Sequence, residues 1–135
     1  MKIEQIFAPN SKDIGFLTKK LSQETPDFDE MHPFAFFIRN KNGQIIAGCD
    51  GSVIFGSIHT RQLWVDANQR KSGLGRRLLT QVHDYGRTNR CKIATLATMS
   101  FHRALEFYKK LGYTVDFERP GYAQNSSCIF LVCSL

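Results

Sequence analysis

The stretch Gln69–Arg77, with the sequence QRKSGLGRR, decides the fold because it joins a strand-like segment to a helix-like one. The segment before it, Gln62 to Val65, is aromatic and branched, as in a buried strand. After it, Leu74, Leu78 and Val82 recur at helical spacing. The two glycines are therefore predicted at a helix N-terminus, where unpaired backbone N–H groups and the helix dipole favour an anion.

The spacing of these glycines separates the common phosphate-binding motifs. A Walker loop needs Gly-x4-Gly-Lys-Ser/Thr, and a dinucleotide motif needs a third glycine where this chain has Leu78. ATP and NAD are therefore not favoured. The remaining pattern, Arg70-x-x-Gly73-x-Gly75, suits a pyrophosphate bound by main chain, and by itself it equally suits a tight strand-to-helix turn.

A second motif follows the predicted helix. Cys91 to Thr98 is strand-like, and the helix predicted to start at Phe101 ends at Gly112, which can adopt the left-handed conformation. Residues 104–113 form the pattern A-x-x-F-Y-x-x-L-G-Y. The order of strand, glycine turn, helix, strand and this pattern resembles the GNAT superfamily of N-acetyltransferases, strongly over residues 56–118 and in outline over the flanks.

Composition and element order set the expected architecture. The 135 residues suit one domain, and 42% hydrophobic residues suffice for a single core. Antiparallel strands before the glycine turn and alternating helices and strands after it predict an α+β fold, with a mixed, mostly antiparallel central sheet flanked by helices. The resemblance adds a V-shaped splay between the two central strands, here Arg61 to Val65 and Ile93 to Thr98. We expect a single GNAT-like domain over residues 1–135.

The flanks carry further signals. Met1 to Phe7 is expected as a first strand, and Asn10 or Ser11 as the cap of a helix. The inner face of that helix is expected to carry three apolar residues, Ile14, Leu17 and Leu21. Asn-Gly at residues 42–43 predicts a hairpin. Strands are expected around it and towards the C-terminus, at 34–39, 44–49, 52–55, 57–65, 114–118 and 127–133.

The charge of the chain is concentrated beside the glycine turn. Residues 70–92 hold seven basic residues against one acidic residue, which accounts for the whole net charge of +6. A ligand with several phosphates would be attracted there, and coenzyme A fits better than nucleic acid, because the patch lacks interleaved aromatic residues and nucleic-acid-binding motifs. A solvated helix face is the plain alternative.

Cysteine usage and hydropathy limit the compartment and partners. Cys49, Cys91, Cys128 and Cys133 form no C-x-x-C pair, so buried reduced thiols are expected rather than disulfides or a metal site. No secretory segment or membrane-length apolar run occurs, which favours the cytoplasm and no membrane partner. The sequence is compatible with a homodimer as well as with a monomer.

The resemblance implies where acetyl-CoA binds. Main-chain groups of Leu63, Trp64 and Val65 would bind the pantetheine arm, and an N–H there could stabilise an oxyanion. The pyrophosphate would bind along the glycine turn, which comprises Arg70, Lys71, Ser72, Gly73, Leu74, Gly75, Arg76 and Arg77. The family often has Asn where this chain has Phe101, so that contact is lost or taken over by Ser100 or His102.

Tyr108 occupies the position of the family's general acid, which protonates the departing thiolate. A phenol suits this because it stays protonated at neutral pH. The alternative is a tyrosine that only packs in the core. For the base, His59 is a candidate with a pKa in the useful range, or else a structural histidine. Asp66 can cap a loop and Asp50 can be a turn residue.

The loop after the first predicted helix carries the candidates for the acceptor site. The resemblance implies that the loop after the first helix walls the acceptor site, and the candidate residues are Asp27, Asp29, Glu30 and Phe34. Such a wall would suit a cationic amine, small or peptidic, whereas a solvated acidic loop fits equally well. No metal-ligand spacing is recognised.

The sequence thus predicts an acetyl-CoA-dependent N-acetyltransferase that transfers an acetyl group directly to a primary amine. The first alternative is an acyl-CoA-binding module without catalysis. The second is a basic nucleic-acid-binding protein.

Overall fold

The computed structural model describes all 135 residues, and the chain divides into two compact units, Met1–Glu30 and Met31–Leu135. The first unit contains one helix, α1, which spans Ser11–Gln23. The side chain of Asn10 caps α1 by accepting a 2.8 Å hydrogen bond from the N–H of Asp13. The predicted helix and its cap are therefore confirmed, with Asn10 as the capping residue.

One expectation for this unit is wrong. Met1–Phe7 forms no strand, because a strand needs a hydrogen-bonded neighbour and the unit offers none. Within the unit, the expected inner face of α1 has no other regular element to pack against. Ile14, Leu17 and Leu21 keep 49%, 57% and 65% of their accessible surface.

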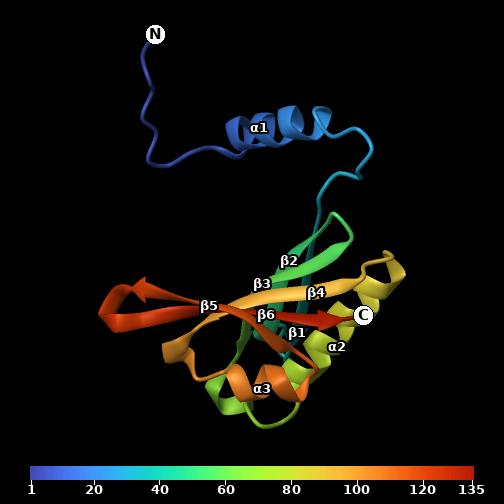
Figure 1. Cartoon of the computed structure of the whole chain (residues 1–135). Coiled ribbons are helices and arrows are strands. Elements are labelled where there is room, and N and C mark those ends of the chain that lie inside the picture. Colours follow the sequence, from blue (N-terminus) through green and yellow to red (C-terminus); the bar gives the residue numbers. More distant parts are fainter. The chain divides into compact units, whose positions relative to one another are not determined.

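The second unit is built on an open six-stranded sheet with strand order β1-β2-β3-β4-β6-β5 (Figure 1). Its strands are β1 (His32–Arg39), β2 (Ile45–Ile54), β3 (Ser57–Val65), β4 (Ile93–Met99), β5 (Thr114–Tyr122) and β6 (Ser126–Ser134). All neighbouring pairs are antiparallel except β3 with β4. The predicted α+β fold with a mixed, mostly antiparallel sheet flanked by helices is confirmed.

Two tight turns close the hairpins of β1, β2 and β3. Gly43 has a φ of 79° in the predicted Asn-Gly turn between β1 and β2. Phe55 and Gly56, with φ of 53° and 74°, connect β2 to β3. The strands expected at 44–49 and 52–55 are one strand, β2, because Asp50 and Gly51 stay paired with β1.

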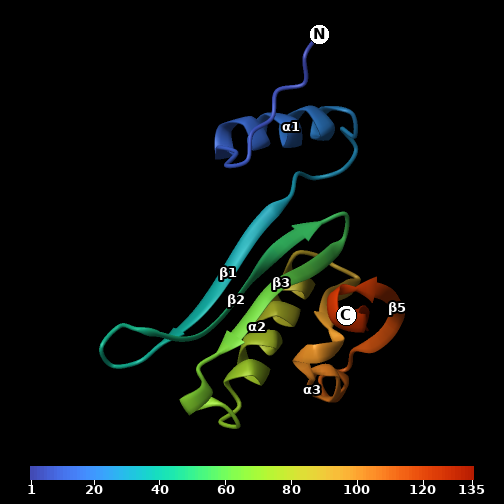
Figure 2. The ribbon, with the colours of Figure 1, turned by 90° about the vertical axis from the view of Figure 1, so that its left-hand side faces the viewer.

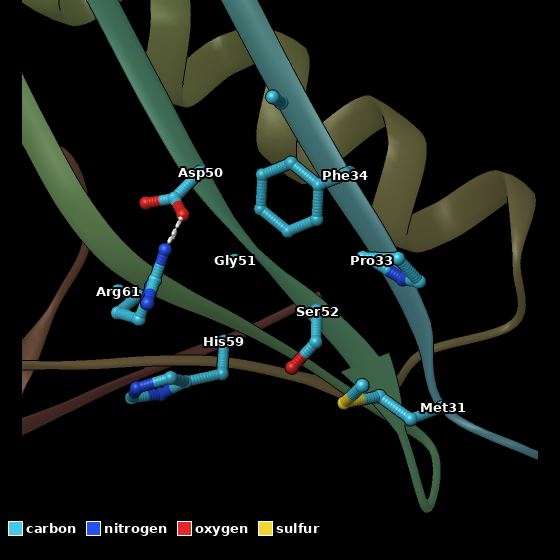
Figure 3. A pocket seen from close by; sticks show the side chains of 9 residues that line it. Met31, Pro33, Phe34, Asp50, Gly51, Ser52, His59 and Arg61 are labelled. Carbon is cyan, nitrogen blue, oxygen red and sulfur yellow. Dashed lines mark hydrogen bonds and ion pairs between the residues drawn. The ribbon is translucent and has the colours of Figure 1, made fainter. Parts of the chain in front are cut away.

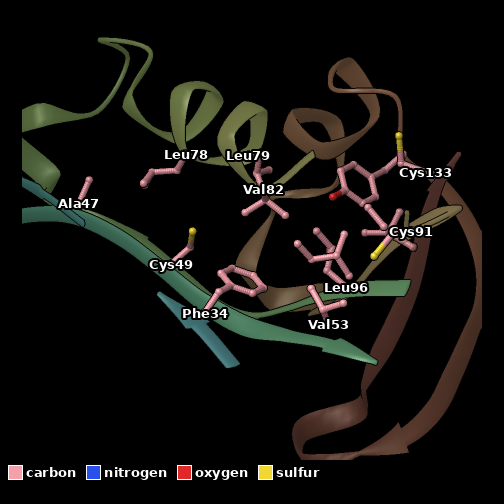
Figure 4. Close-up of a cluster of buried hydrophobic side chains, with 14 of the residues drawn as sticks. Phe34, Ala47, Cys49, Val53, Leu78, Leu79, Val82, Cys91, Leu96 and Cys133 are labelled. Atoms are coloured by element: carbon pink, nitrogen blue, oxygen red, sulfur yellow. The ribbon is translucent and has the colours of Figure 1, made fainter. Parts of the chain in front are cut away.

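Helix α2 (Leu74–Thr88) covers one face of the sheet and packs mainly against β3 and β2 (Figure 2). Leu78, Leu79 and Val82 are buried, as their spacing predicts. Figure 4 shows these side chains above Cys49 and other core residues of the strands. Burial of each such side chain stabilises the fold by about 1.5–3 kcal/mol, so α2 is held firmly on the sheet.

The two central strands, β3 and β4, are parallel but pair over only part of their length. Ser57–Thr60 pairs with Ile93–Leu96, and the pairing stops there. Beyond this point β3 continues along β2 and β4 continues along β6. The predicted V-shaped splay is therefore confirmed, and the facing main-chain edges of residues 61–65 and 97–99 have no strand partner.

The helix after β4 is shorter than predicted. Ser100–His102 forms a separate 3-10 turn, and Arg103 is left-handed, with a φ of 55°, so the helix α3 spans only Leu105–Lys110. Gly112 ends this segment with a φ of 97°, as expected. β5 extends four residues past the predicted end, to Tyr122.

All four cysteines are buried, as expected, and none is bonded to another. None of the helices is both long enough and apolar enough to cross a membrane.

Candidate active site

A β-bulge lies where β3 leaves β4. Asp50 of β2 is opposite Gln62, whereas the next residue, Gly51, is opposite Thr60, so β3 contains one extra residue. Only glycine fits on β2 at this point, because a Cβ on Gly51 would lie 1.8 Å from the carbonyl oxygen of His59. The bulge is thus fixed by a close backbone approach.

The extra residue, Arg61, changes which side chains of β3 share a face. Before it, Ile58 and Thr60 are buried beneath α2. After it, Leu63 and Val65 pack against the same core. The inward positions change from even to odd numbers across the bulge, which leaves Arg61 and its successor together on the opposite face.

Asp50 binds both of these side chains. Its Oδ2 accepts a 3.0 Å hydrogen bond from Nε of Arg61 and also pairs with a terminal guanidinium nitrogen (Figure 3). Its Oδ1 accepts a 3.3 Å bond from Nε2 of Gln62. Asp50 therefore lies inside β2 as part of a polar cluster, and the expectation of a turn residue is wrong.

The main chain of Leu63 and Val65 faces the open side of the splay. The N–H of Asp66 donates to the carbonyl of Ile46 in β2 at 2.8 Å, and alternate residues of a strand direct their polar groups to opposite neighbours. The backbone N–H and C=O groups of Leu63 and Val65 consequently point towards the space beside β3 that β4 no longer occupies. The Val65 carbonyl already accepts a 3.1 Å bond from Nε of Arg70. Trp64 is half exposed.

Side chains fix the loop between β3 and α2. The carboxylate of Asp66 accepts a 2.9 Å bond from the N–H of Asn68, so Asp66 caps the loop. The hydroxyl of Ser72 donates to the carbonyl of Gln69. Lys71 adopts a positive φ of 64°. The loop therefore reaches the helix in a defined conformation.

Gly73 begins α2 in the left-handed conformation, with φ 84° and ψ 9°, and no side chain caps the helix. A Cβ on Gly73 would meet no atom within 4 Å, so the space beside the first N–H groups is open. An anion fits there because the helix dipole is positive at this end. Exposed basic side chains surround it, namely Arg70, Lys71, Arg76 and Arg77.

Gly75 serves packing. A Cβ on Gly75 would lie 2.9 Å from the ring of Phe107, so the glycine lets α3 approach α2. Leu74 packs partly buried against the core. The two predicted glycines thus have different reasons to be glycine.

Tyr108 lies on α3 with its ring half-buried. It makes edge contacts with the rings of Phe107 and Tyr113, at centroid distances of 5.2 and 6.0 Å. Burial raises the pKa of its phenol, which keeps the proton on at neutral pH. The Tyr108 hydroxyl makes no hydrogen bond within the protein, whereas that of Tyr113 bonds Nε2 of buried His83 at 2.9 Å.

His59 lies near the end of the β3–β4 pairing, opposite Thr95. Its Nδ1 lies 2.9 Å from the hydroxyl of Thr95, and burial lowers the pKa of its imidazole. The ring is therefore neutral near pH 7 and can accept a proton. Behind it, the Thr60 hydroxyl is buried without any hydrogen-bond partner.

A cavity of about 530 Å³ lies over β1, β2 and β3. Its lining residues are Met31, Pro33, Phe34, Ala35, Asp50, Gly51, Ser52, His59 and Arg61 (Figure 3). Of the residues predicted for the acceptor, this cavity includes Phe34. Asp27, Asp29 and Glu30 belong to the N-terminal unit.

Phe101 is exposed in its 3-10 turn and stacks with His102. The hydroxyl of Ser100 accepts a 3.0 Å bond from the N–H of Ser127, so it is engaged with β6. No group of three or more His, Cys, Asp and Glu side chains is placed to hold a metal ion.

The Asp50–Arg61 cluster is the part of the site that sequence reasoning missed. The signal was present, because the inward positions of β3 change parity between Thr60 and Leu63, and such a change marks a bulge. Gly51 on the neighbouring strand was the second sign.

Comparisons with known proteins agree with this geometry. The model of the Acetyltransferase (GNAT) family matches residues 3–113. Blasticidin-S acetyltransferase of Streptomyces morookaense is 30% identical over 103 residues, which are 76% of this chain and 75% of that protein.

Solved structures have the same fold. An acetyltransferase from Bacillus cereus is 25% identical, with a TM-score of 0.79 over 98% of both chains. A Bacillus anthracis protein described as a streptothricin acetyltransferase, in complex with acetyl coenzyme A, is 18% identical. Its TM-score is 0.69 over 76% of this chain and 62% of its own.

Proposed function

The chain belongs to the acetyltransferase (GNAT) family and is an acyltransferase, and we propose that it transfers the acetyl group of acetyl-CoA directly to a primary amine. The observation that carries this proposal is the end of β3–β4 pairing at Thr60 and Leu96 beside the uncapped start of α2. A free strand edge and a free helix N-terminus together suit a long ligand with an amide-rich arm and a pyrophosphate.

The coenzyme would lie along these two elements. Leu63 and the N–H of Val65 offer main-chain groups to the pantetheine arm, with Trp64 between them. The N–H groups at Gly73, Leu74 and Gly75 would bind the pyrophosphate. Exposed side chains of the turn, which are Lys71, Ser72, Arg76 and Arg77, add hydrogen bonds and positive charge. Arg70 acts by holding the carbonyl of Val65.

Two side chains would handle protons. Acetyl-CoA supplies an activated thioester. The amine nitrogen forms the new C–N bond while the C–S bond breaks. His59, neutral near pH 7, takes a proton from the amine directly or through water, and Tyr108 gives its proton to the sulfur. β3 carries His59 and α3 carries Tyr108.

The named relatives support an amine-bearing acceptor. One relative is named for blasticidin-S, and a structural neighbour is described as acting on streptothricin and holds acetyl coenzyme A. Both descriptions are compatible with acetyl transfer to small molecules by this chain.

The proposal is tested by thiol release from acetyl-CoA across polyamines, aminoglycosides, amino acids and peptides. Release with at least one acceptor, matched by a product one acetyl group heavier, supports it. Coenzyme A binding without release under any acceptor would indicate the acyl-CoA-binding module instead. Stabilisation by DNA or RNA and not by coenzyme A would indicate the nucleic-acid-binding alternative.

The helix start is tested separately with Gly73→Asn. Asparagine tolerates the left-handed conformation better than most residues, so the turn should survive while the new side chain fills the open space. Coenzyme A affinity should fall about 10-fold or more. The matched control is Gly43→Asn, where φ is 79° and a Cβ also meets nothing. Equal affinity in both variants would place the pyrophosphate elsewhere.

A further inference from the structure

The cavity beside the bulge contains one negative and one positive group that are already paired. Asp50 keeps 25% and Arg61 68% of its side-chain exposure, so a ligand can reach both. His59 adds no charge near neutral pH, because burial lowers its pKa. The charged lining is therefore balanced, unlike the acidic loop that the sequence placed at the acceptor site.

This balance discriminates between ligands of different charge. A singly charged amine that binds Asp50 competes with Arg61 for the carboxylate. A ligand that carries only a carboxylate would bind Arg61 and compete with Asp50 for the guanidinium. A carboxylate without its partner is costly at Asp50, whose side chain is largely buried, whereas the more exposed Arg61 stays solvated. A ligand that carries both an ammonium and a carboxylate gives each group a new partner.

The other wall of the cavity is apolar. Met31, Pro33, Phe34 and Ala35 come from the start of β1 and its approach, opposite the charged pair. Their surface suits an aliphatic or aromatic group a few carbon atoms in size. A volume of about 530 Å³ accommodates a small molecule.

We propose that the acceptor is a small zwitterion of the apolar amino-acid type, with its ammonium towards Asp50 and His59 and its carboxylate towards Arg61. This inference rests on the proposed function, because it assigns the substrate class of the same site. The ammonium loses its proton to His59 or water before nitrogen attacks the thioester. The carboxylate stays intact and serves only for binding.

Three probes with one apolar chain separate the contributions of the charges. L-leucine carries both groups, L-leucinamide lacks the carboxylate charge, and 3-methylbutylamine lacks the carboxyl group altogether. With the wild-type enzyme and acetyl-CoA, we expect kcat/KM for L-leucine to exceed that of either other probe by about 10-fold or more. An equal or higher kcat/KM for L-leucinamide or 3-methylbutylamine would overturn the inference.

Substitutions test the assignment of the guanidinium. Arg61→Gln should lower kcat/KM for L-leucine by about 10-fold and change that for 3-methylbutylamine less than about 2-fold. The control is Arg119→Gln on β5, outside the cavity, which should change neither. Asp50→Asn provides a second variant if Arg61→Gln does not fold. It should also lower kcat/KM for L-leucine. Unchanged preference in a folded variant would contradict the assignment.

Calorimetric titration distinguishes failure of the inference from failure of the proposed function. If no amine releases thiol, but L-leucine binds more tightly than 3-methylbutylamine, then acetyl transfer is wrong and the zwitterion site stands. If another amine is acetylated while L-leucine neither binds nor reacts, then acetyl transfer stands and the zwitterion site is wrong.

Discussion

The two halves of β3 share one strand but differ in what surrounds them. Ser57–Thr60 pairs on both sides, with β2 and with β4. After the bulge residue Arg61, Gln62–Val65 pairs only with β2, so its other edge is free. The first half contributes to the sheet ladder, and the second leaves main chain available to a ligand.

The bulge separates these halves, and it depends on one glycine. Because Gly51 admits the carbonyl of His59, β3 gains Arg61 and turns its polar side chains to one face. The difference between the halves teaches that one register shift can both open a binding edge and gather charged groups beside it. Substitutions that disturb the backbone of the paired half should therefore affect stability, whereas those around the open half should affect activity.

The largest effect is expected for Gly51→Ala. The added Cβ would lie 1.8 Å from a backbone oxygen, which cannot move away as a flexible side chain could. We expect a loss of about 3 kcal/mol in the free energy of unfolding, measured by urea denaturation. The control is Gly15→Ala in α1, where a Cβ meets nothing and stability should rise slightly. Equal stability of the two variants would contradict the role of the bulge.

Next is Tyr108→Phe, which should lower kcat by about 10²-fold. The Tyr108 hydroxyl has no partner in the protein, so its removal leaves no unsatisfied group, and stability should change by less than about 1 kcal/mol. Steady-state rates and a denaturation curve check both parts. An unchanged kcat, with chemistry rate-limiting, would make Tyr108 a packing residue only.

The opposite outcome is expected for the neighbouring tyrosine. Tyr113→Phe removes the hydroxyl that bonds His83, and the buried imidazole loses its partner. We expect a loss of about 1–3 kcal/mol in the free energy of unfolding and a kcat close to that of the wild type. A large loss of kcat in a folded Tyr113→Phe variant would contradict the assignment of a purely structural role to Tyr113.

The smallest effect is the dependence of stability on pH. Burial lowers the pKa of both His59 and His83 below 6.5 in the folded protein. Between the folded and the unfolded pKa values, only the unfolded chain binds the proton. The contribution of these histidines to stability is therefore fully present above about pH 6.5 and is lost as the pH falls through the folded pKa values. His59→Gln and His83→Gln should each flatten the fall in Tm below pH 6.5. Parallel curves for all variants would refute this.

The sequence predicted most of the fold because its signals are local. The glycine turn, the apolar spacing of α2, the Asn-Gly hairpin and Gly112 each depend on residues close together in the chain. The splay between β3 and β4 followed from the family resemblance. The segment Met1–Phe7 misled because its composition suits a strand, whereas a strand exists only with a neighbour.

The binding site was only partly predictable. The turn at Gly73 carries its own signal, but Asp50 and Arg61 are 11 positions apart and meet only through the register of β2 and β3. Composition gives no measure of that register. A closer reading of the parity change along β3 would have located the bulge, but not the partner of Arg61.

In the proposed mechanism the coenzyme binds along the open half of β3 and the start of α2. Titration of isotope-labelled protein with coenzyme A, followed by the NMR signals of its amides, tests this directly. We predict that the amides of Leu63, Val65, Gly73 and Gly75 shift strongly, while those of Ser57–Thr60 hardly move. Shifts confined to the paired half, or no shifts at α2, would contradict the claim.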